Sequence, residues 1–169
     1  MTFKAHAFDT PLDRMVAVAD EEGAVVLLVF LNGRSAEDQV AGFAPVEWSA
    51  AACAEVVAAV ERWFAGASDA FEALRLRPAG SAFQQQVWKE VRRVSWGSTA
   101  SYGEIATRLG RPGASRAVGR ANATNPVCLA IPCHRIVGAD GSLTGYGGGM
   151  ATKEALLALE SGQRPLILS

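Results

Sequence analysis

The chain has 169 residues, half of them hydrophobic, which is enough for one domain or two small domains with a hydrophobic core. Its longest apolar run, Ala24–Leu31, is too short to span a membrane, and its first residues lack the apolar region of a signal peptide, so we expect a cytoplasmic protein without a membrane anchor. The net charge of −1 combines a net −6 in residues 1–81, from six basic and twelve acidic residues, with a net +5 in residues 82–169, from ten basic and five acidic residues. The basic half either meets an anion such as nucleic acid or reflects charges that cluster on solvated faces.

Cysteine and histidine usage limits the chemistry. Three cysteines cannot all pair within one chain, and their spacing is typical of neither a disulfide framework nor a zinc site, so we expect reduced thiols. Only two histidines, His6 and His134, are present, which argues against a structural zinc. We therefore predict no metal and no cofactor, and we expect His6 and Cys53 to be structural.

The first half has the pattern of a small α/β domain over residues 1–77. Apolar, β-branched segments separated by turns such as Asn32–Gly33 predict a small antiparallel sheet. An alanine-rich segment with larger apolar residues at helical spacing predicts one long helix. The expected strands are residues 3–8, 15–19, 24–31 and 71–76, and the expected helix is residues 49–64.

A linker, residues 78–81, leads into a mostly helical domain over residues 82–169. A Ser-x-x-Gln pattern at Ser81 and a Ser-x-x-Glu pattern at Ser101 each indicate the start of a helix. Ser115 is expected to cap a third helix. The second and third helices, joined by a glycine turn, predict a helix-turn-helix, although an ordinary pair of packed helices has the same pattern.

The third helix contains little bulk. Ala117 and Ala121 lie one turn apart, with Gly119 beside them, so one face allows close approach to another surface. Arg116 and Arg120 are also one turn apart and can reach phosphates or bases. A helix of this kind suits a minor groove about 6 Å wide, which agrees with the basic charge of this half.

The segment Ile131–Arg135 places a thiol beside an imidazole. A thiol becomes a good nucleophile once it loses its proton, and a neighbouring base or cation favours that loss. Cys133, followed by His134 and Arg135, is therefore a candidate activated cysteine. The same residues also fit a buried cysteine that acts as a small hydrophobe.

In order and spacing, the motifs of this half resemble those of the O6-alkylguanine-DNA alkyltransferases, also called methylated-DNA–protein-cysteine methyltransferases. The resemblance covers most of the chain and is strongest from Phe83 to Glu160. Each motif alone is weak, but the ordered set is specific. The motifs are Phe83–Trp88, Ser101–Glu104, Arg116–Gly119, Asn125–Val127, Ile131–Arg135, Gly145–Tyr146 and Lys153–Glu154.

The resemblance implies an RNase H-like N-terminal support domain and a C-terminal domain that reacts with duplex DNA containing O6-alkylguanine. It implies that Cys133 attacks the alkyl carbon, with His134 as its general base through a water and Glu160 supporting the imidazole. Tyr102 is expected to donate a proton to guanine N3, and Asn125 to tie the third helix to the active-site segment. Because no group in the site can hydrolyse the thioether product, the protein is expected to react once.

The resemblance also implies how DNA is bound. The damaged base is expected to flip out through the minor groove while Arg116 fills the vacated space. The remaining expected contacts of the third helix are Ser115, Ala117, Gly119, Arg120 and Ala121. The expected base pocket consists of Arg135, Ile136, Tyr146 and Gly147, the last of which replaces a serine found in relatives. We expect a monomer, and cooperative binding along DNA is left open.

Three other functional classes share part of this pattern. A non-catalytic lesion-binding relative would lack the nucleophile, which is present here as Cys133. A Cys-His hydrolase normally has its two residues far apart in the sequence. A transcription regulator that uses the helix-turn-helix leaves the segment Ile131–Arg135 unexplained. Cys128, unusual at its position, is either a second alkylation target or a buried residue, and we expect burial.

Overall fold

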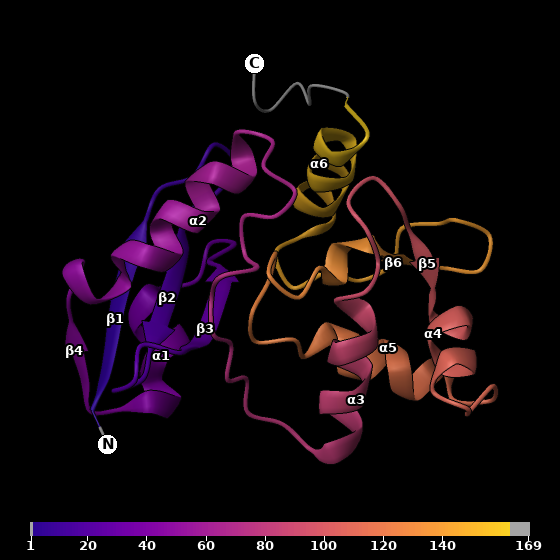
Figure 1. Ribbon diagram of the computed structural model, residues 1–169, viewed down its shortest axis with the longest axis horizontal. Coiled ribbons are helices and arrows are strands. Elements are labelled where there is room, and N and C mark those ends of the chain that lie inside the picture. Colours follow the sequence, from indigo (N-terminus) through magenta and orange to yellow (C-terminus); the bar gives the residue numbers. More distant parts are fainter. Residues whose placement is uncertain (1, 163–169) are drawn as a thin grey trace. The chain divides into compact units, whose positions relative to one another are not determined.

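The computed structural model describes residues 2–162 and separates into two compact units, Met1–Ala79 and Gly80–Ser169 (Figure 1). The division falls inside the segment 78–81, where the sequence suggests a linker. Within the described part of the chain, no helix has both the length and the apolar composition needed to cross a bilayer.

A four-stranded sheet with the strand order β3-β2-β1-β4 forms the first unit. β1, β2 and β3 pair antiparallel, as predicted. β4 pairs parallel with β1, so the sheet is mixed and not purely antiparallel. The cause is the connection between β3 and β4, which returns the chain to the end of the sheet where β1 begins. The strands are β1 (Phe3–Phe8), β2 (Met15–Ala19), β3 (Val25–Phe30) and β4 (Val46–Trp48).

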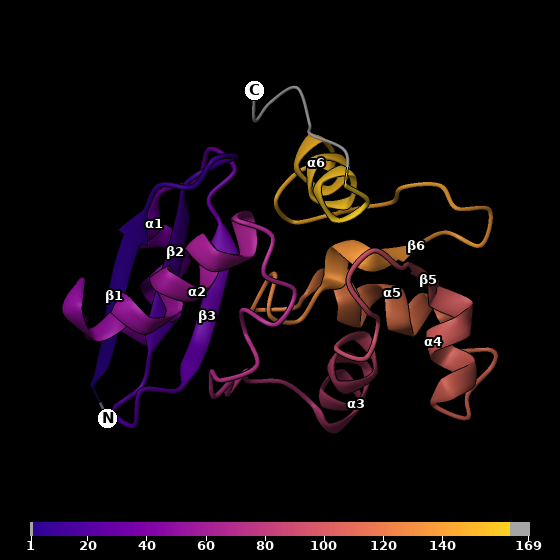
Figure 2. The ribbon, with the colours of Figure 1, turned by 45° about the horizontal axis from the view of Figure 1, so that its top comes forward.

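Helices cover both faces of this sheet (Figure 2). On one face lies α2 (Ala54–Phe64), which follows the 3-10 turn η2 (Ala51–Cys53) and buries an apolar stripe that includes Trp63. The predicted helix therefore starts later than residue 49. On the other face α1 (Ala36–Val40), continued by η1 (Ala41–Phe43), packs on apolar strand residues.

The predicted strand over residues 71–76 is wrong. Residues 68–74 form successive turns, and only Leu76 bridges to Val25 of β3. The N–H groups of Glu72 and Leu74 donate to carbonyls three residues earlier, so this backbone is engaged locally and is not available to a ladder. The apolar residues that suggested a strand are nevertheless buried, as Phe71 and Leu74 show.

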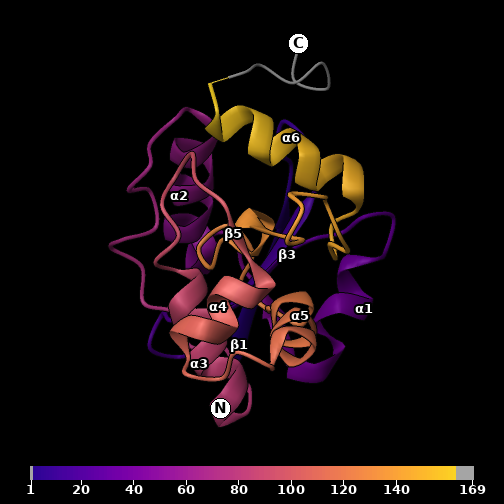
Figure 3. The same ribbon diagram turned by 90° about the vertical axis from the view of Figure 1, so that its right-hand side faces the viewer.

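In the second unit, helices lie on both sides of a two-stranded parallel sheet (Figure 3). The last helix, α6, lies on one side, and α3, α4 and α5 lie on the other. Trp88 of α3 donates its indole N–H to the Ala121 carbonyl of α5 at 2.8 Å, which joins two of these helices. The elements are α3 (Ala82–Val91), β5 (Ala100–Ser101), α4 (Tyr102–Arg108), α5 (Ser115–Ala123), η3 (Cys133–Arg135), β6 (Ile136–Val137) and α6 (Met150–Glu160).

The helix starts follow the predicted caps with one exception. Ser81 and Gln84 form a reciprocal capping box at α3, and Ser101 caps α4 by accepting the Glu104 N–H at 3.0 Å. Ser115, predicted as a cap, is instead the first residue of α5. The turn before it supplies the reason, because the Ala114 carbonyl already accepts the first helical N–H, from Val118, at 2.9 Å.

Candidate active site

The 3-10 turn η3 positions the thiol and the imidazole. The Cys133 N–H donates to the Ile131 carbonyl at 2.7 Å, and the Arg135 N–H donates to the Pro132 carbonyl at 2.9 Å. The three residues of the turn are buried. β6 begins directly after the turn at Ile136 and pairs with β5, so the small sheet anchors the segment that carries Cys133.

Glu160, the last residue of α6, joins His134 to Arg135. Its carboxylate lies 3.0 Å from His134 Nε2. The Nε atom of Arg135 donates to both carboxylate oxygens, at 2.9 and 3.0 Å, and its Nη1 donates to the Val94 carbonyl at 2.6 Å. The end of α6, which is remote in the sequence, thus supplies a carboxylate that contacts both His134 and Arg135.

Burial and charge fix the protonation of this group. Burial lowers the pKa of His134, so its imidazole is neutral at neutral pH. Burial alone would raise the pKa of Glu160, but hydrogen bonds from His134 and Arg135 outweigh it and hold the pKa below its ordinary value. The carboxylate 3.0 Å from Nε2 favours the tautomer that carries its proton on Nε2, which leaves the lone pair on Nδ1, where a base accepts a proton.

The Cys133 thiol has an environment that favours ionisation. A hydrogen bond from Cys128 contributes most to lowering the pKa of Cys133, and Asn125 and the charge of Lys153 add to it against the opposing effect of burial. Tyr146 also interacts with both sulfurs, and burial with the nearby sulfur charge raises the pKa of its phenol, which stays protonated. In the first unit, by contrast, burial raises the pKa of Cys53 to about 11.

Lys153 is a buried amine that sequence reasoning left without a role. Its side chain is 0% exposed, and its Nζ donates to the carbonyls of Ile136 at 2.6 Å and Thr144 at 2.9 Å. Burial lowers the pKa of Lys153, and the charge of Cys133 offsets part of that effect. The signal was available in the helix pattern, because Lys153, Leu156 and Glu160 recur at helical spacing, which places two charged residues on an apolar face.

Two asparagines hold the backbone around Cys133 in place. Asn125 donates to the Ile131 carbonyl at 2.8 Å and accepts the Val127 N–H at 2.9 Å. Asn122, which sequence reasoning missed, lies near the end of α5 and donates to the Cys133 carbonyl at 3.2 Å. Its 3% exposure shows that the contact is internal. Asn122 thus links α5 directly to Cys133, in addition to the contact that Asn125, just after α5, makes with Ile131.

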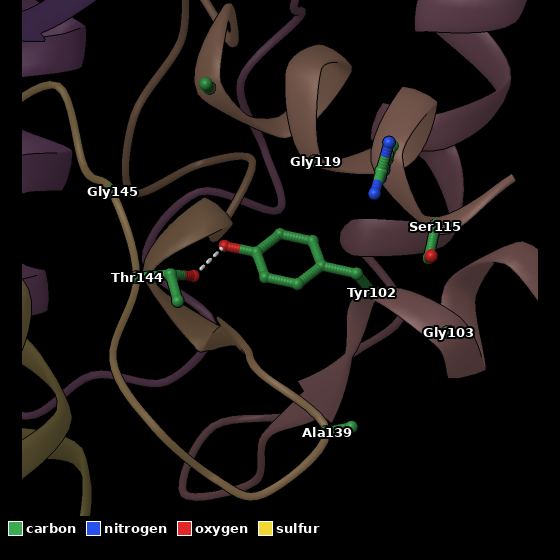
Figure 4. Close-up of a pocket in the computed structure, with 9 residues that line it drawn as sticks. Tyr102, Gly103, Ser115, Gly119, Ala139, Thr144 and Gly145 are labelled. Atoms are coloured by element: carbon green, nitrogen blue, oxygen red, sulfur yellow. Dashed lines mark hydrogen bonds between the residues drawn. The ribbon is translucent and has the colours of Figure 1, made fainter.

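The residues predicted to bind DNA lie on two sides of α5. Ser115, Arg116 and Gly119 line a pocket of about 490 Å³ together with Tyr102 and Thr144 (Figure 4). A second hollow, of about 370 Å³, borders the start of α3. Of the predicted residues, it contains Ala117, Arg120 and Ala121.

The residues predicted to form the base pocket are only partly brought together. Tyr146 lies beside Cys133, and Ile136 is buried with its carbonyl engaged by Lys153. Gly147 is exposed. Arg135 does not face such a pocket, because its guanidinium is held by Glu160 and Val94. A buried cation needs an anionic or hydrogen-bonding partner, and this requirement explains why the Arg135 guanidinium points toward Glu160.

Known proteins resemble this chain in sequence and in fold. A family model described as "6-O-methylguanine DNA methyltransferase, DNA binding domain" matches residues 82–162. A methylated-DNA–protein-cysteine methyltransferase of Mycobacterium leprae is 40% identical over 157 residues, 93% of this chain and 92% of that protein. One of Mycolicibacterium paratuberculosis is 50% identical over 107 residues, which span 63% of this chain and 64% of that protein.

A solved structure is also similar to this chain over nearly its whole length. The crystal structure of Mycobacterium tuberculosis OGT in complex with DNA superposes with a TM-score of 0.83 and 37% identity, covering 98% of this chain and 97% of that one. The M. leprae protein is similar over nearly the whole of both chains, so the likeness extends beyond the helical unit. The chain therefore belongs to the methylated-DNA–protein-cysteine methyltransferase family.

Proposed function

We propose that this protein repairs alkylated DNA by transferring the alkyl group from guanine O6 to Cys133, once per molecule. The observation that carries the proposal is the burial of Cys133 and His134 together with a Glu160 carboxylate 3.0 Å from the imidazole. Membership of the family supports it. The retained thiol argues against the alternative of a lesion-binding protein that lacks the nucleophile.

The reaction is a single displacement. His134 takes the thiol proton through a water, and Glu160 holds the imidazole in the required orientation. The Cys133 sulfur forms a bond to the alkyl carbon as the bond from that carbon to O6 breaks. The electron pair passes to the guanine, and Tyr102 donates its proton to guanine N3. The thioether cannot be hydrolysed by any group proposed here, so the protein is consumed.

The proposed partner is duplex DNA that contains O6-alkylguanine. A base inside the stack must be flipped out, at a cost of a few kcal/mol that is smaller for a mispaired lesion. Arg116, exposed on α5, fills the vacated space, and the small residues Ala117, Gly119 and Ala121 let the helix approach the minor groove. Ser115 and Arg120 contact the backbone.

The proposal extends to assembly, surroundings and cofactors. The protein acts as a monomer, because the set Cys133, His134 and Glu160 is complete within one chain. It works in the reducing cytoplasm, where the free thiols of its three cysteines persist. The displacement as written requires no metal or cofactor.

Intact-mass spectrometry of the protein after incubation with duplex DNA carrying O6-methylguanine tests the proposal. We expect the mass of one added methyl group on Cys133 and no addition in Cys133→Ser. The same DNA without the lesion is the control. Tight binding of damaged DNA without a mass change would instead establish a lesion-binding protein, and hydrolysis of an ester or peptide would establish a hydrolase.

A further inference from the structure

Thr144 touches the phenol that the proposed reaction uses as its acid. The Tyr102 hydroxyl and the Thr144 hydroxyl lie 2.6 Å apart (Figure 4). Tyr102 is the first residue of α4, and Thr144 belongs to the segment between β6 and α6. Both line the pocket that also contains Arg116. The pair therefore joins two distant segments at the place where a flipped base would enter.

The backbone of Thr144 is held by a buried lysine. Its carbonyl accepts a hydrogen bond from the buried Lys153 Nζ at 2.9 Å, and the same amine holds the Ile136 carbonyl at 2.6 Å. One amine on α6 thus ties the segment that carries Thr144 to β6, which follows the nucleophile turn. Thr144 is consequently held by an internal group and does not depend on its side-chain contact for its position.

During the reaction, only one of the two hydroxyls can donate the hydrogen bond between Tyr102 and Thr144. Either oxygen can donate in the free protein. Once the Tyr102 phenol donates to a nitrogen of the base, its oxygen can only accept from Thr144. As the phenolic proton leaves, the oxygen gains negative charge, and a hydrogen bond to a charged acceptor is about twice as strong as a neutral one.

We propose that Thr144 is a positioning residue that orients the Tyr102 hydroxyl and stabilises its phenolate during alkyl transfer. The Tyr102 O–H bond breaks, an N–H bond forms at guanine N3, and the electron pair of the broken carbon–O6 bond enters the guanine ring. Thr144 keeps its own proton throughout. This inference rests on the proposed function. It makes the residue at position 144 a determinant of the rate of transfer and not of DNA binding.

Single-turnover rates of methyl transfer from O6-methylguanine duplex DNA to Cys133 test this role. Thr144→Val keeps the shape and removes the hydroxyl, and it should lower the maximal rate by roughly tenfold, as expected for a hydrogen bond to a charged group. The DNA concentration that gives the half-maximal rate should not change. Thr144→Ser retains the hydroxyl and should restore most of the rate.

A double-mutant cycle connects the effect to Tyr102. Tyr102→Phe should be slow by itself, and adding Thr144→Val to it should cause no further loss. The proposal is overturned if Thr144→Val reacts as fast as the unmodified chain or faster, which would make Thr144 an obstacle to the base. It is also overturned if Thr144→Val slows both backgrounds equally, or if Tyr102→Phe reacts normally. Failure of the proposed function gives a different result, since Cys133 of the unmodified chain would then gain no methyl group, and both proposals would fall.

Discussion

Glu160 interacts with two residues of different charge, His134 and Arg135. Its carboxylate lies 3.0 Å from the imidazole of His134, which we propose it orients as a base, and it neutralises Arg135, a cation that is only 7% exposed. Removing one member of a buried ion pair leaves the other unpaired, at a cost of about 3–5 kcal/mol. This carboxylate therefore serves stability and reactivity at the same time.

Glu160→Gln should destabilise the protein by about 3 kcal/mol at neutral pH and slow alkyl transfer by about a hundredfold or more. Because the folded-state pKa of Glu160 is lowered, its stabilisation is present at neutral pH and is lost as the pH falls below 4.5 toward the folded-state pKa. Urea unfolding at several pH values should show a smaller acid dependence in the variant. Glu154→Gln, exposed on the same helix, is the control. Equal stability of the variant and the unmodified chain at neutral pH would contradict the prediction.

Cys128→Ala should change the pH dependence of the reaction. The hydrogen bond from Cys128 contributes most to the lowered pKa of Cys133, so its loss raises that pKa. Since the thiolate is the nucleophile, the rise of the transfer rate with pH should move to higher pH, and a pKa higher by one should lower the rate below the midpoint by about tenfold. Rates measured from pH 5 to 9 test this. Cys53→Ala should keep the original profile, and a changed profile in that control would point to a general effect on folding.

At the scale of elements, α5 carries both the arginines that we propose to contact DNA and the contact of Asn122 with Cys133. Arg116→Ala should slow repair in duplex DNA by about thirtyfold, because a loss of about 2 kcal/mol in holding an extrahelical base has that effect. Reaction with free O6-alkylguanine base requires no flipping and should keep its rate. Arg108→Ala removes the same charge from the neighbouring helix α4 and is the control. Equal slowing with both substrates would exclude Arg116 as the residue that fills the stack.

Elements that depend on residues close together in the sequence were predictable, and elements that depend on contacts with distant parts of the chain were not. Capping at Ser81 and Ser101 depends on residues three positions away, so the sequence alone reveals it. The short strand β4 has no such pattern and exists because β1 offers it an edge. The site follows the same rule. Cys133 and His134 are neighbours in the sequence, whereas the contacts of Asn122, Thr144 and Lys153 depend on groups that only the fold brings near.

For the molecule as a whole, charge is divided between the units, with net −6 in residues 1–81 and +5 in residues 82–169. Binding to undamaged duplex DNA should weaken with salt, with a slope of about −0.9 per phosphate contacted. Arg120→Ala should reduce the magnitude of that slope by about one. Arg14→Ala makes the same change of charge in the first unit and should leave the slope as it was. Fluorescence anisotropy at several salt concentrations checks both, and equal effects of the two variants would mean that Arg120 makes no phosphate contact.

The position of Glu160 at the end of α6 also sets the order in which the site matures during translation. The ribosome adds Cys133 first and Glu160 27 residues later, which takes roughly one to five seconds at the usual rates of synthesis. During that interval His134 lacks its carboxylate, and Lys153 is not yet present to contribute its charge until 20 residues after Cys133. The nascent chain therefore lacks both the carboxylate beside His134 and the charge of Lys153, and the site is complete only after its last supporting helix has been made.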